Sequence, residues 1–292
     1  MTQDKTMTKV EMIRDLAVQI RRDTIMAISC AGTGHPGGAL GAAEIFAVLY
    51  REALNQSPEN LNCPNRDRFV LSNGHICASY YACLARCGYF DPGLLKQFRK
   101  LGSPLQGHPS RIHLPSFIEA SSGPLGQGLS VANGLALALR QEGRGSRVYC
   151  LVGDGEMQEG QIWEAILTAA QHRLSNVTLV ISYNGLQIDG DIAEVKNIEP
   201  LEEKMNAFGW FVLDVDGHDP DALMSAFARV KESTDAPSAI IARTVMGRGV
   251  SFMENQAKWH GGSLSQDQVR DALSEIGLSR QYVDFTVEGV FA

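Results

Sequence analysis

A carboxylate stands between two glycines where an apolar run ends. The stretch "RVYCLVGDG" places Gly153, Asp154 and Gly155 directly before a helical pattern, and Asn184 follows the next apolar run. Asp154 alone would be a helix cap or a turn residue, which is a common use of aspartate. Beside Asn184, its carboxylate adds to an amide oxygen and nearby backbone carbonyls, which suit a hard divalent cation. Because Gly155 leaves a free N–H where a helix begins, we expect a metal-bridged diphosphate there.

Histidines form a second group of candidate residues. Five of the seven adjoin a glycine, namely His35, His75, His108, His218 and His260. A single loop histidine is more often a surface residue, but the repeated placement favours a function. Their spacing is not that of a zinc site, and neutral imidazoles exchange protons near pH 7. We therefore expect proton transfer and anion binding, while His218 could equally organise its own "DGHDPD" turn.

The segment "SSGPLGQGLSVANG" is a third candidate. Small residues and Pro124 precede a helical pattern, which a turn and a tightly packed helix start would also explain. In the functional interpretation, the backbone groups of Gly123 and Leu125 face a planar ligand.

The elements that must position these residues follow from the hydrophobic patterns. Five apolar runs are predicted as strands: 68–72, 147–154, 176–184, 210–217 and 237–245. Helical patterns cover 9–31, 40–54, 75–88, 126–142, 158–174, 201–209, 219–233 and 265–277. Strands that alternate with helices and are apolar throughout predict an α/β fold, a parallel sheet with helices on both faces. Ligands of such sheets bind beyond the carboxyl ends of the strands, where Asp154 and Asn184 stand.

Composition bounds the remaining possibilities. The chain has 292 residues, is 44% hydrophobic and 20% charged, and carries a formal net charge of −7. It contains no basic run, signal-peptide core or membrane-length apolar stretch, so we expect no nucleic acid, no membrane and a cytoplasmic location. The six cysteines form no C-x-x-C pair, and reduced thiols are the better interpretation. We expect a flexible segment over 1–8 and one domain over 9–292 that ends in a helix and a tail.

Several motifs together resemble the transketolase family. They are "GHPGGALGAAEI", "LSNGH", "QGHPS", "SSGPLGQGLS" and "GDGEMQEGQIWEA", in the family's order, and "GDG" with the later asparagine resembles the thiamine diphosphate signature. The resemblance covers the chain from about residue 10 to 262 and implies the diphosphate-binding fold of thiamine diphosphate enzymes. The segment "MGRGVSFMENQAKWHGG" before His260 differs from conventional full-length transketolases and is similar to the short, two-subunit forms.

The resemblance also implies roles for individual residues. The Asp154 and Asn184 side chains and the Leu186 carbonyl would hold Mg²⁺, Ca²⁺ or Mn²⁺. The cofactor-binding set would comprise His75, Gly123, Leu125, Gly153, Asp154, Gly155, Glu156, Asn184 and His260. The donor-sugar channel would be lined by His35, His75, His108 and His260, which handle hydroxyl protons. Glu159 and Glu164 match acidic positions that face a subunit contact and a shared proton network, so Glu159 joins the catalytic set.

In this family, an activating glutamate and arginines that grip the sugar phosphate belong to a separate pyrimidine-binding domain. We expect a second polypeptide, a C-terminal transketolase subunit, to supply them, in a dimer of heterodimers that acts on sugar phosphates. The best local anchors for a sugar phosphate are Arg111, Arg243 and Arg248, although a structural role is favoured for each.

Two other interpretations remain open. One is another thiamine diphosphate enzyme, such as a 1-deoxyxylulose-5-phosphate synthase or a 2-oxo acid dehydrogenase α subunit. The other is a non-catalytic cofactor-binding or regulatory module. The sugar is also open, since two-subunit transketolases could serve the pentose phosphate pathway or a specialised sugar-acid or sulfosugar route.

Overall fold

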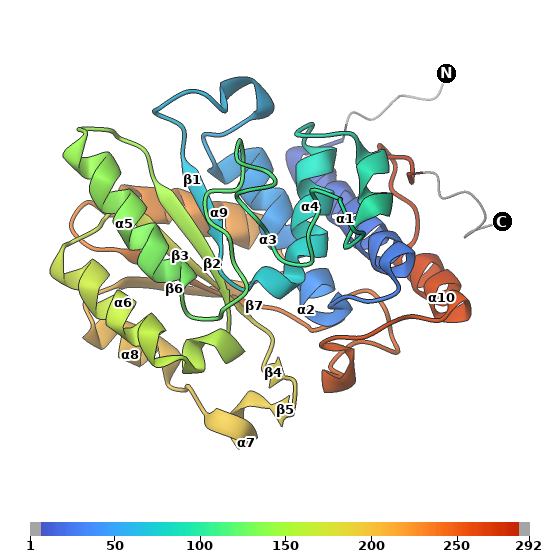
Figure 1. The fold of residues 1–292 in the computed structure, drawn as a ribbon. Helices are drawn as coiled ribbons and strands as arrows, with labels where there is room; N and C mark the ends of the chain where they lie inside the picture. Colours follow the sequence, from blue (N-terminus) through green and yellow to red (C-terminus); the bar gives the residue numbers. More distant parts are fainter. Residues whose placement is uncertain (1–6, 286–292) are drawn as a thin grey trace.

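The computed structural model describes residues 7–285 and contains one five-stranded parallel sheet (Figure 1). The strands are β1 (Arg68–Leu71), β2 (Val148–Gly153), β3 (Val177–Tyr183), β6 (Phe211–Asp216) and β7 (Ser238–Arg243), in the order β1-β2-β3-β7-β6. Gly153 pairs with Ser182 at the carboxyl ends of β2 and β3. The predicted neighbourhood of the two strand ends is therefore confirmed, and Asp154 and Asn184 project from the same edge.

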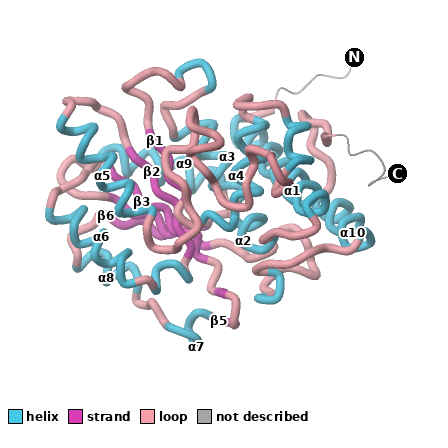
Figure 2. The backbone as a smooth tube through the Cα atoms, in the orientation of Figure 1, coloured by secondary structure: helices cyan, strands magenta, loops and turns pink. Residues whose placement is uncertain are grey.

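Helices cover both faces of the sheet, as predicted (Figures 1 and 2). One core lies under α1 (Lys9–Ala31), α3 (Ala43–Val48), α4 (Cys77–Arg86) and α9 (Pro220–Glu232). The other lies under α5 (Gly128–Gln141), α6 (Gly160–Gln171) and α8 (Leu201–Ala207). Successive β2 residues alternate between them, since Tyr149 and Leu151 enter the first core and Cys150 and Val152 the second. This two-sided burial explains why the strands read as continuous apolar runs.

The expected helix over 40–54 is wrong in its limits. Helical structure begins earlier with α2 (Pro36–Gly41), breaks before α3, and ends in a π-helical segment, Leu49–Ala53. A Cβ on Gly41 would lie 2.8 Å from the Val245 carbonyl oxygen. The break therefore lies where the loop after β7 comes into close contact with the backbone.

The segment after Asn184 forms elements that the sequence did not predict. The two-residue strands β4 (Leu186–Gln187) and β5 (Gly190–Asp191) pair in an antiparallel hairpin, and α7 (Ile192–Lys196) follows. Two-residue strands are too short to give a hydrophobic period. Figure 1 shows this hairpin beyond the carboxyl edge of the sheet.

The loop after β7 has a small core of its own. Val250, Met253 and Trp259 pack with Ile25 of α1 and with α10 (Gln266–Ile276), which matches the expected last helix. Within residues 7–285, no helix has the length and hydropathy of a membrane span, and the six cysteines are free thiols. Most of the segment expected to be flexible, 1–6, lies outside the described residues, as does the end of the expected tail, 286–292.

Candidate functional site

A pocket opens at the carboxyl edge of the sheet, beyond β2 and β3. Its empty volume is about 770 Å³. Its lining includes most of the candidates singled out from the sequence: His75, Leu125, Gly153, Asp154, Gly155, Glu156, Glu159, Asn184, Leu186 and His260. Gly123, His35 and His108 are not part of this lining, and the ring of His108 lies 3.7 Å from where a Cβ on Gly123 would be. Motifs that are far apart in the sequence therefore converge on one hollow.

Asp154 is the most constrained carboxylate of the pocket. Its Oδ2 accepts N–H bonds from Asn184 (2.8 Å) and Gly185 (2.6 Å), and its Oδ1 accepts one from Gly155 (2.8 Å). The side chain is 2% exposed, and burial raises its pKa to about 6 despite these bonds. Among residues 7–285 it forms no ion pair. A buried carboxylate without a counter-charge is a suitable ligand for a cation.

Glu156 lies two residues away and has a different environment. Its Oε1 accepts from the Ser72 hydroxyl and from the Gly126 N–H (2.8 Å), and its Oε2 accepts from the Gly153 N–H (3.3 Å). Ser72 in turn accepts the Gly128 N–H at 3.0 Å. Burial raises the pKa of Glu156. This carboxylate joins the ends of β1 and β2 to the start of α5, so it holds the pocket wall together.

Sequence reasoning missed two further polar side chains that line the pocket, those of Asn73 and Gln187. The Asn73 Oδ1 and the Gln187 Nε2 are buried without a hydrogen-bond partner, and both residues line the pocket. Because both atoms lie at the pocket and have no partner among the described residues, they are available to hydrogen-bond a ligand there. Asn73 lies two residues after the end of β1, and its place near a strand end could have identified it. Gln187 belongs to the hairpin that gave no sequence signal.

Four of the five glycine-flanked histidines form one cluster. The ring centroid of His35 lies 5.3 Å from that of His75, 5.7 Å from that of His260 and 6.3 Å from that of His108. Burial, followed by the neighbouring rings, lowers the pKa of His75 to about 3 and that of His35 to about 4. Burial also lowers the pKa of His108 and His260. These rings are therefore neutral near pH 7, and each can accept one hydrogen bond and donate another to a hydroxyl group.

The glycines beside these histidines allow the chain segments to approach each other closely. Gly34 and Gly262 exchange two backbone hydrogen bonds of 2.9 and 2.8 Å, which bring His35 and His260 together. A Cβ on Gly37 would lie 2.7 Å from the Trp259 carbonyl oxygen, and one on Gly74 2.4 Å from the Ser122 hydroxyl. Gly37 and Gly74 are therefore required by packing around the cluster.

His218 lies outside the cluster and has a structural role. Its Nε2 accepts the Val245 N–H at 2.8 Å, so its Nδ1 carries the proton and donates to Glu44 at 3.0 Å. Burial raises the pKa of Glu44, but Arg21 and the His218 hydrogen bond outweigh burial and lower the pKa to about 2. The open alternative is thus resolved in favour of the turn-organising role, which ties the turn after β6 to the loop after β7.

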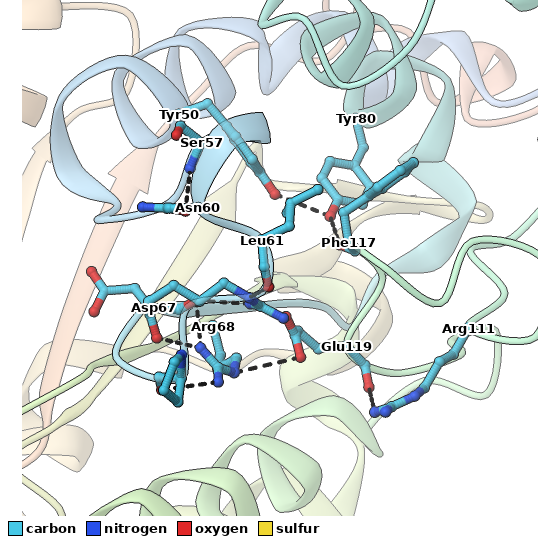
Figure 3. Close-up of polar contacts among 12 residues, drawn as sticks. Tyr50, Ser57, Asn60, Leu61, Asp67, Arg68, Tyr80, Arg111, Phe117 and Glu119 are labelled. Atoms are coloured by element: carbon cyan, nitrogen blue, oxygen red, sulfur yellow. Dashed lines mark hydrogen bonds and ion pairs between the residues drawn. The ribbon is translucent and has the colours of Figure 1, made fainter. Parts of the chain in front are cut away.

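A polar network holds the loop that carries His108 against β1 (Figure 3). Arg66 forms an ion pair with Glu119, and Arg111 donates to the Glu119 carbonyl oxygen at 2.9 Å. The other two arginine candidates are also engaged: Arg243 pairs with Asp214 and Glu199, and Arg248 lies 3.7 Å from Glu254. The structural role favoured for the three arginines matches these contacts.

Metal ligation at this site would need other oxygen groups in addition to an acidic side chain. No three side chains of histidine, cysteine, aspartate or glutamate within 7–285 are grouped to hold an ion. Asp154, the Asn184 amide and the Leu186 carbonyl are a mixed oxygen set of the kind that Mg²⁺ completes with water and phosphate. Asn184 Oδ1 already accepts the Leu186 N–H at 2.9 Å, which fixes its amide between the two expected partners.

Comparison with known proteins gives consistent matches. Residues 10–289 match the family described as transketolase, thiamine diphosphate binding domain. A 6-deoxy-6-sulfo-D-fructose transketolase subunit of Clostridium sp. (strain MSTE9) is 39% identical over 257 residues, covering 88% of this chain and 93% of that protein. An apulose-4-phosphate transketolase subunit of Actinobacillus succinogenes is 38% identical over 262 residues, covering 89% and 94%. The structure of transketolase from Leishmania mexicana superposes with a TM-score of 0.87 at 31% identity, covering 98% of this chain but only 44% of that one.

Proposed function

The chain belongs to the transketolase thiamine diphosphate-binding family, and we propose that it is the diphosphate- and metal-binding subunit of a two-chain transketolase. The reaction would move a two-carbon ketol unit from a ketose with an anionic end group to an aldose. When bound, thiamine diphosphate supplies the electron sink that this carbon–carbon cleavage needs. The neutral histidine cluster beside the pocket is the observation that carries the proposal.

The residues of the pocket fit a diphosphate bound through a divalent cation. Its lining within 7–285 contains the carboxylates of Asp154, Glu156 and Glu159 but no lysine or arginine. A diphosphate there would meet only negative side-chain charge unless a cation lay between them. Asp154, Asn184 and the Leu186 carbonyl would hold Mg²⁺, Ca²⁺ or Mn²⁺, while His75 and His260 would contact phosphate oxygens. The Gly155 N–H, expected to be free, instead donates to Asp154 Oδ1 and would contact a phosphate oxygen only by leaving that carboxylate. The unpaired Asn73 and Gln187 atoms offer two more polar contacts.

The histidine cluster would handle the protons of the sugar. Because the pKa values of His35 and His75 lie well below 7, their rings are neutral there, so each can accept a hydrogen bond from a sugar hydroxyl at one ring nitrogen and donate one at the other. His108 and His260 complete the channel, and Gly123 and Leu125 would orient the aminopyrimidine through backbone groups.

A second chain would complete the site. The two similar proteins named as subunits are matched over 93% and 94% of their length, which supports the same organisation for this chain. The α5–α6 pair supports it too, because Val131 and Leu167 are 40% and 58% exposed there, near the exposed Glu159 and Glu164. We propose that this face contacts the partner that carries the pyrimidine-binding domain and the activating glutamate.

Reconstitution tests the proposal. The chain should be purified alone and together with a companion transketolase subunit from the same source, with thiamine diphosphate and Mg²⁺ present. We expect ketol transfer from ketose phosphates only in the mixture, and no turnover of pyruvate. Pyruvate turnover without ketol transfer would indicate a different thiamine diphosphate enzyme, and full activity of the isolated chain would refute the two-chain organisation.

A further inference from the structure

Three buried side chains form a chain of polar contacts that ends at the loop after β7. Arg21 of α1 donates to Glu44 of α3 through both arms of its guanidinium, at 2.7 and 2.5 Å, and its Nε donates to the Leu40 carbonyl oxygen at 3.0 Å. Glu44 Oε2 also accepts from His218 Nδ1 at 3.0 Å. The three side chains are between 8% and 10% exposed. Because a buried ion pair is costly to break, the imidazole ring is held in a fixed position.

The far side of the ring holds the backbone of the loop after β7. His218 Nε2 accepts the Val245 N–H at 2.8 Å, and the Val245 carbonyl oxygen lies 2.8 Å from where a Cβ on Gly41 would be. The turn that carries His218 is itself packed against β7, since a Cβ on Gly217 would lie 2.9 Å from the Arg243 carbonyl oxygen. Val245 is therefore held from two sides, by the imidazole and by the break between α2 and α3.

Met246, the next residue, links this contact to the pocket beyond β2 and β3, the diphosphate pocket. It is 1% exposed and belongs to the pocket lining. A Cβ on Gly37 would lie 2.7 Å from Met246 Cγ, and the Gly247 N–H donates to the Gly37 carbonyl oxygen at 2.8 Å. Gly37 stands two residues after His35 of the histidine cluster. The backbone on both sides of Met246 is thus held, on one side by the imidazole of His218.

We propose that His218 is a positioning residue: by accepting the Val245 N–H it sets where Met246 stands in the wall of the diphosphate pocket, and so how tightly the pocket binds its ligand. Only a neutral ring with its proton on Nδ1 can do this, because Nε2 must accept from a backbone donor. Burial raises the pKa of Glu44, but Arg21 outweighs burial and the pKa falls to about 2. The carboxylate is therefore ionised near pH 7, and its bond to Nδ1 selects this tautomer. The identity of the ligand rests on the proposed function, whereas the position of Met246 does not.

Two substitutions of His218 separate the two hydrogen bonds of its ring. The side-chain amide of asparagine reaches about as far as Nδ1 does, and that of glutamine about as far as Nε2. His218→Asn can therefore still donate to Glu44 but leaves the Val245 N–H without an acceptor. His218→Gln can still accept that N–H but loses the bond to Glu44. Each variant lacks one buried hydrogen bond, so their losses of stability should be similar, and the contact with the loop is what differs.

NMR of the cofactor-free chain tests the position of Met246 directly. The solvent exchange of the Val245 amide and the methyl signal of Met246 should be followed with isotope-labelled amides and methionine methyl groups. We expect His218→Asn to speed the amide exchange at least about tenfold and to shift the methyl signal, while His218→Gln keeps both close to those of the unchanged chain. His172→Asn, the same change at an exposed histidine that ends α6, is the control. An unshifted methyl signal in His218→Asn, or equal shifts in both His218 variants, would overturn the proposal.

Cofactor binding tests what the position of Met246 does. The Mg²⁺-dependent affinity for thiamine diphosphate should be measured by calorimetry, beside urea unfolding of each variant. We expect His218→Asn to weaken binding about tenfold and His218→Gln less than about threefold, although both lower the unfolding free energy by similar amounts. Equal losses of affinity in the two variants would mean that His218 acts on stability alone. If the unchanged chain bound no thiamine diphosphate, the proposed function would be contradicted, and the amide and methyl signals would still decide the position of Met246.

Discussion

The diphosphate pocket and the histidine cluster adjoin each other but are built in opposite ways. The pocket lies on regular elements, with Asp154 and Asn184 at the ends of two hydrogen-bonded strands, and its charged side chains are carboxylates. The cluster is assembled from loops around residues 35, 75, 108 and 260, and its rings are neutral. Arg99 is the cation beside it. A negative pocket needs a cation to hold an anion, whereas the cluster can take a polar substrate directly.

Glu156 and Asp154 lie two residues apart in the pocket wall and differ in their hydrogen-bond partners. Both are buried carboxylates, but Glu156 is bonded to the Ser72 hydroxyl and to two backbone N–H groups from separate segments. Asp154 accepts three N–H bonds that all come from strand ends around the pocket. We interpret Glu156 as a structural link and Asp154 as the group that turns the edge of the sheet into a metal site.

Asp154→Ala should have the largest effect on ligand binding. Removing the only carboxylate among the expected metal ligands leaves the diphosphate facing the remaining acids. We expect Mg²⁺-dependent thiamine diphosphate affinity, measured by calorimetry, to fall at least about 1,000-fold, or about 4 kcal/mol. Asp189→Ala, at the exposed tip of the neighbouring hairpin, is the control and should bind normally. Unchanged binding by Asp154→Ala would refute the metal assignment.

Glu156→Ala should instead lower the unfolding free energy of the chain. It would leave the buried N–H of Gly126 and the Ser72 hydroxyl without their acceptor, which costs about 2–3 kcal/mol of unfolding free energy. Glu156→Gln retains one acceptor oxygen and should recover part of that loss. Urea unfolding of the cofactor-free chain measures both. If Glu156→Ala unfolded like the unchanged chain but bound cofactor poorly, the structural interpretation of Glu156 would be wrong.

The sequence was informative where function is tied to regular structure. The strand ends of β2 and β3 and the helix after Gly155 could be predicted because hydrophobic runs and glycines mark them directly. The histidines could be singled out by their glycine neighbours, but which of the five meet could not, because this depends on contacts such as Gly34 with Gly262.

Arg99 and Gln187 show which features of the site could not be predicted from the sequence. Arg99 stands in an irregular segment. Its guanidinium can lie near His35 and His108 because Gly107 has no Cβ there. Gln187 lies in a hairpin of two-residue strands. No local pattern records either environment, whereas the arginines that did attract notice, Arg111 and Arg243, are engaged by Glu119 and Asp214.

The neutral cluster should make the chain sensitive to acid. Burial lowers the pKa of His75 to about 3, below its unfolded value near 6.5, so the unfolded state binds more protons between these values. The stability is therefore present above about pH 6.5 and is lost as pH falls. His75→Gln should reduce the slope of unfolding free energy against pH by up to about 1.4 kcal/mol per unit in this range. His113→Gln, outside the cluster, is the control, and an unaltered slope in His75→Gln would show that the ring is not held neutral.

The smallest effect on the isolated chain is expected at the edge of the pocket that faces the proposed partner. Glu159 and Glu164 are exposed and form no ion pair within the described chain, so Glu159→Gln with Glu164→Gln should change the unfolding free energy by less than about 0.5 kcal/mol. The same pair of changes should weaken association with the companion chain about tenfold, measured by analytical ultracentrifugation.

The reason is that the Glu159 and Glu164 carboxylates, unlike those of Asp154 and Glu156, accept no hydrogen bond and form no ion pair among residues 7–285. Glu203→Gln removes one exposed charge of the same sign from α8, a different helix from the one that carries Glu164, and should leave association intact. If the Glu203 variant weakened association as much as the double variant, net charge rather than a specific contact would explain the loss. If the double variant destabilised the isolated chain, both acids would belong to the fold, as Glu156 does, and the assigned partner face would have to move elsewhere.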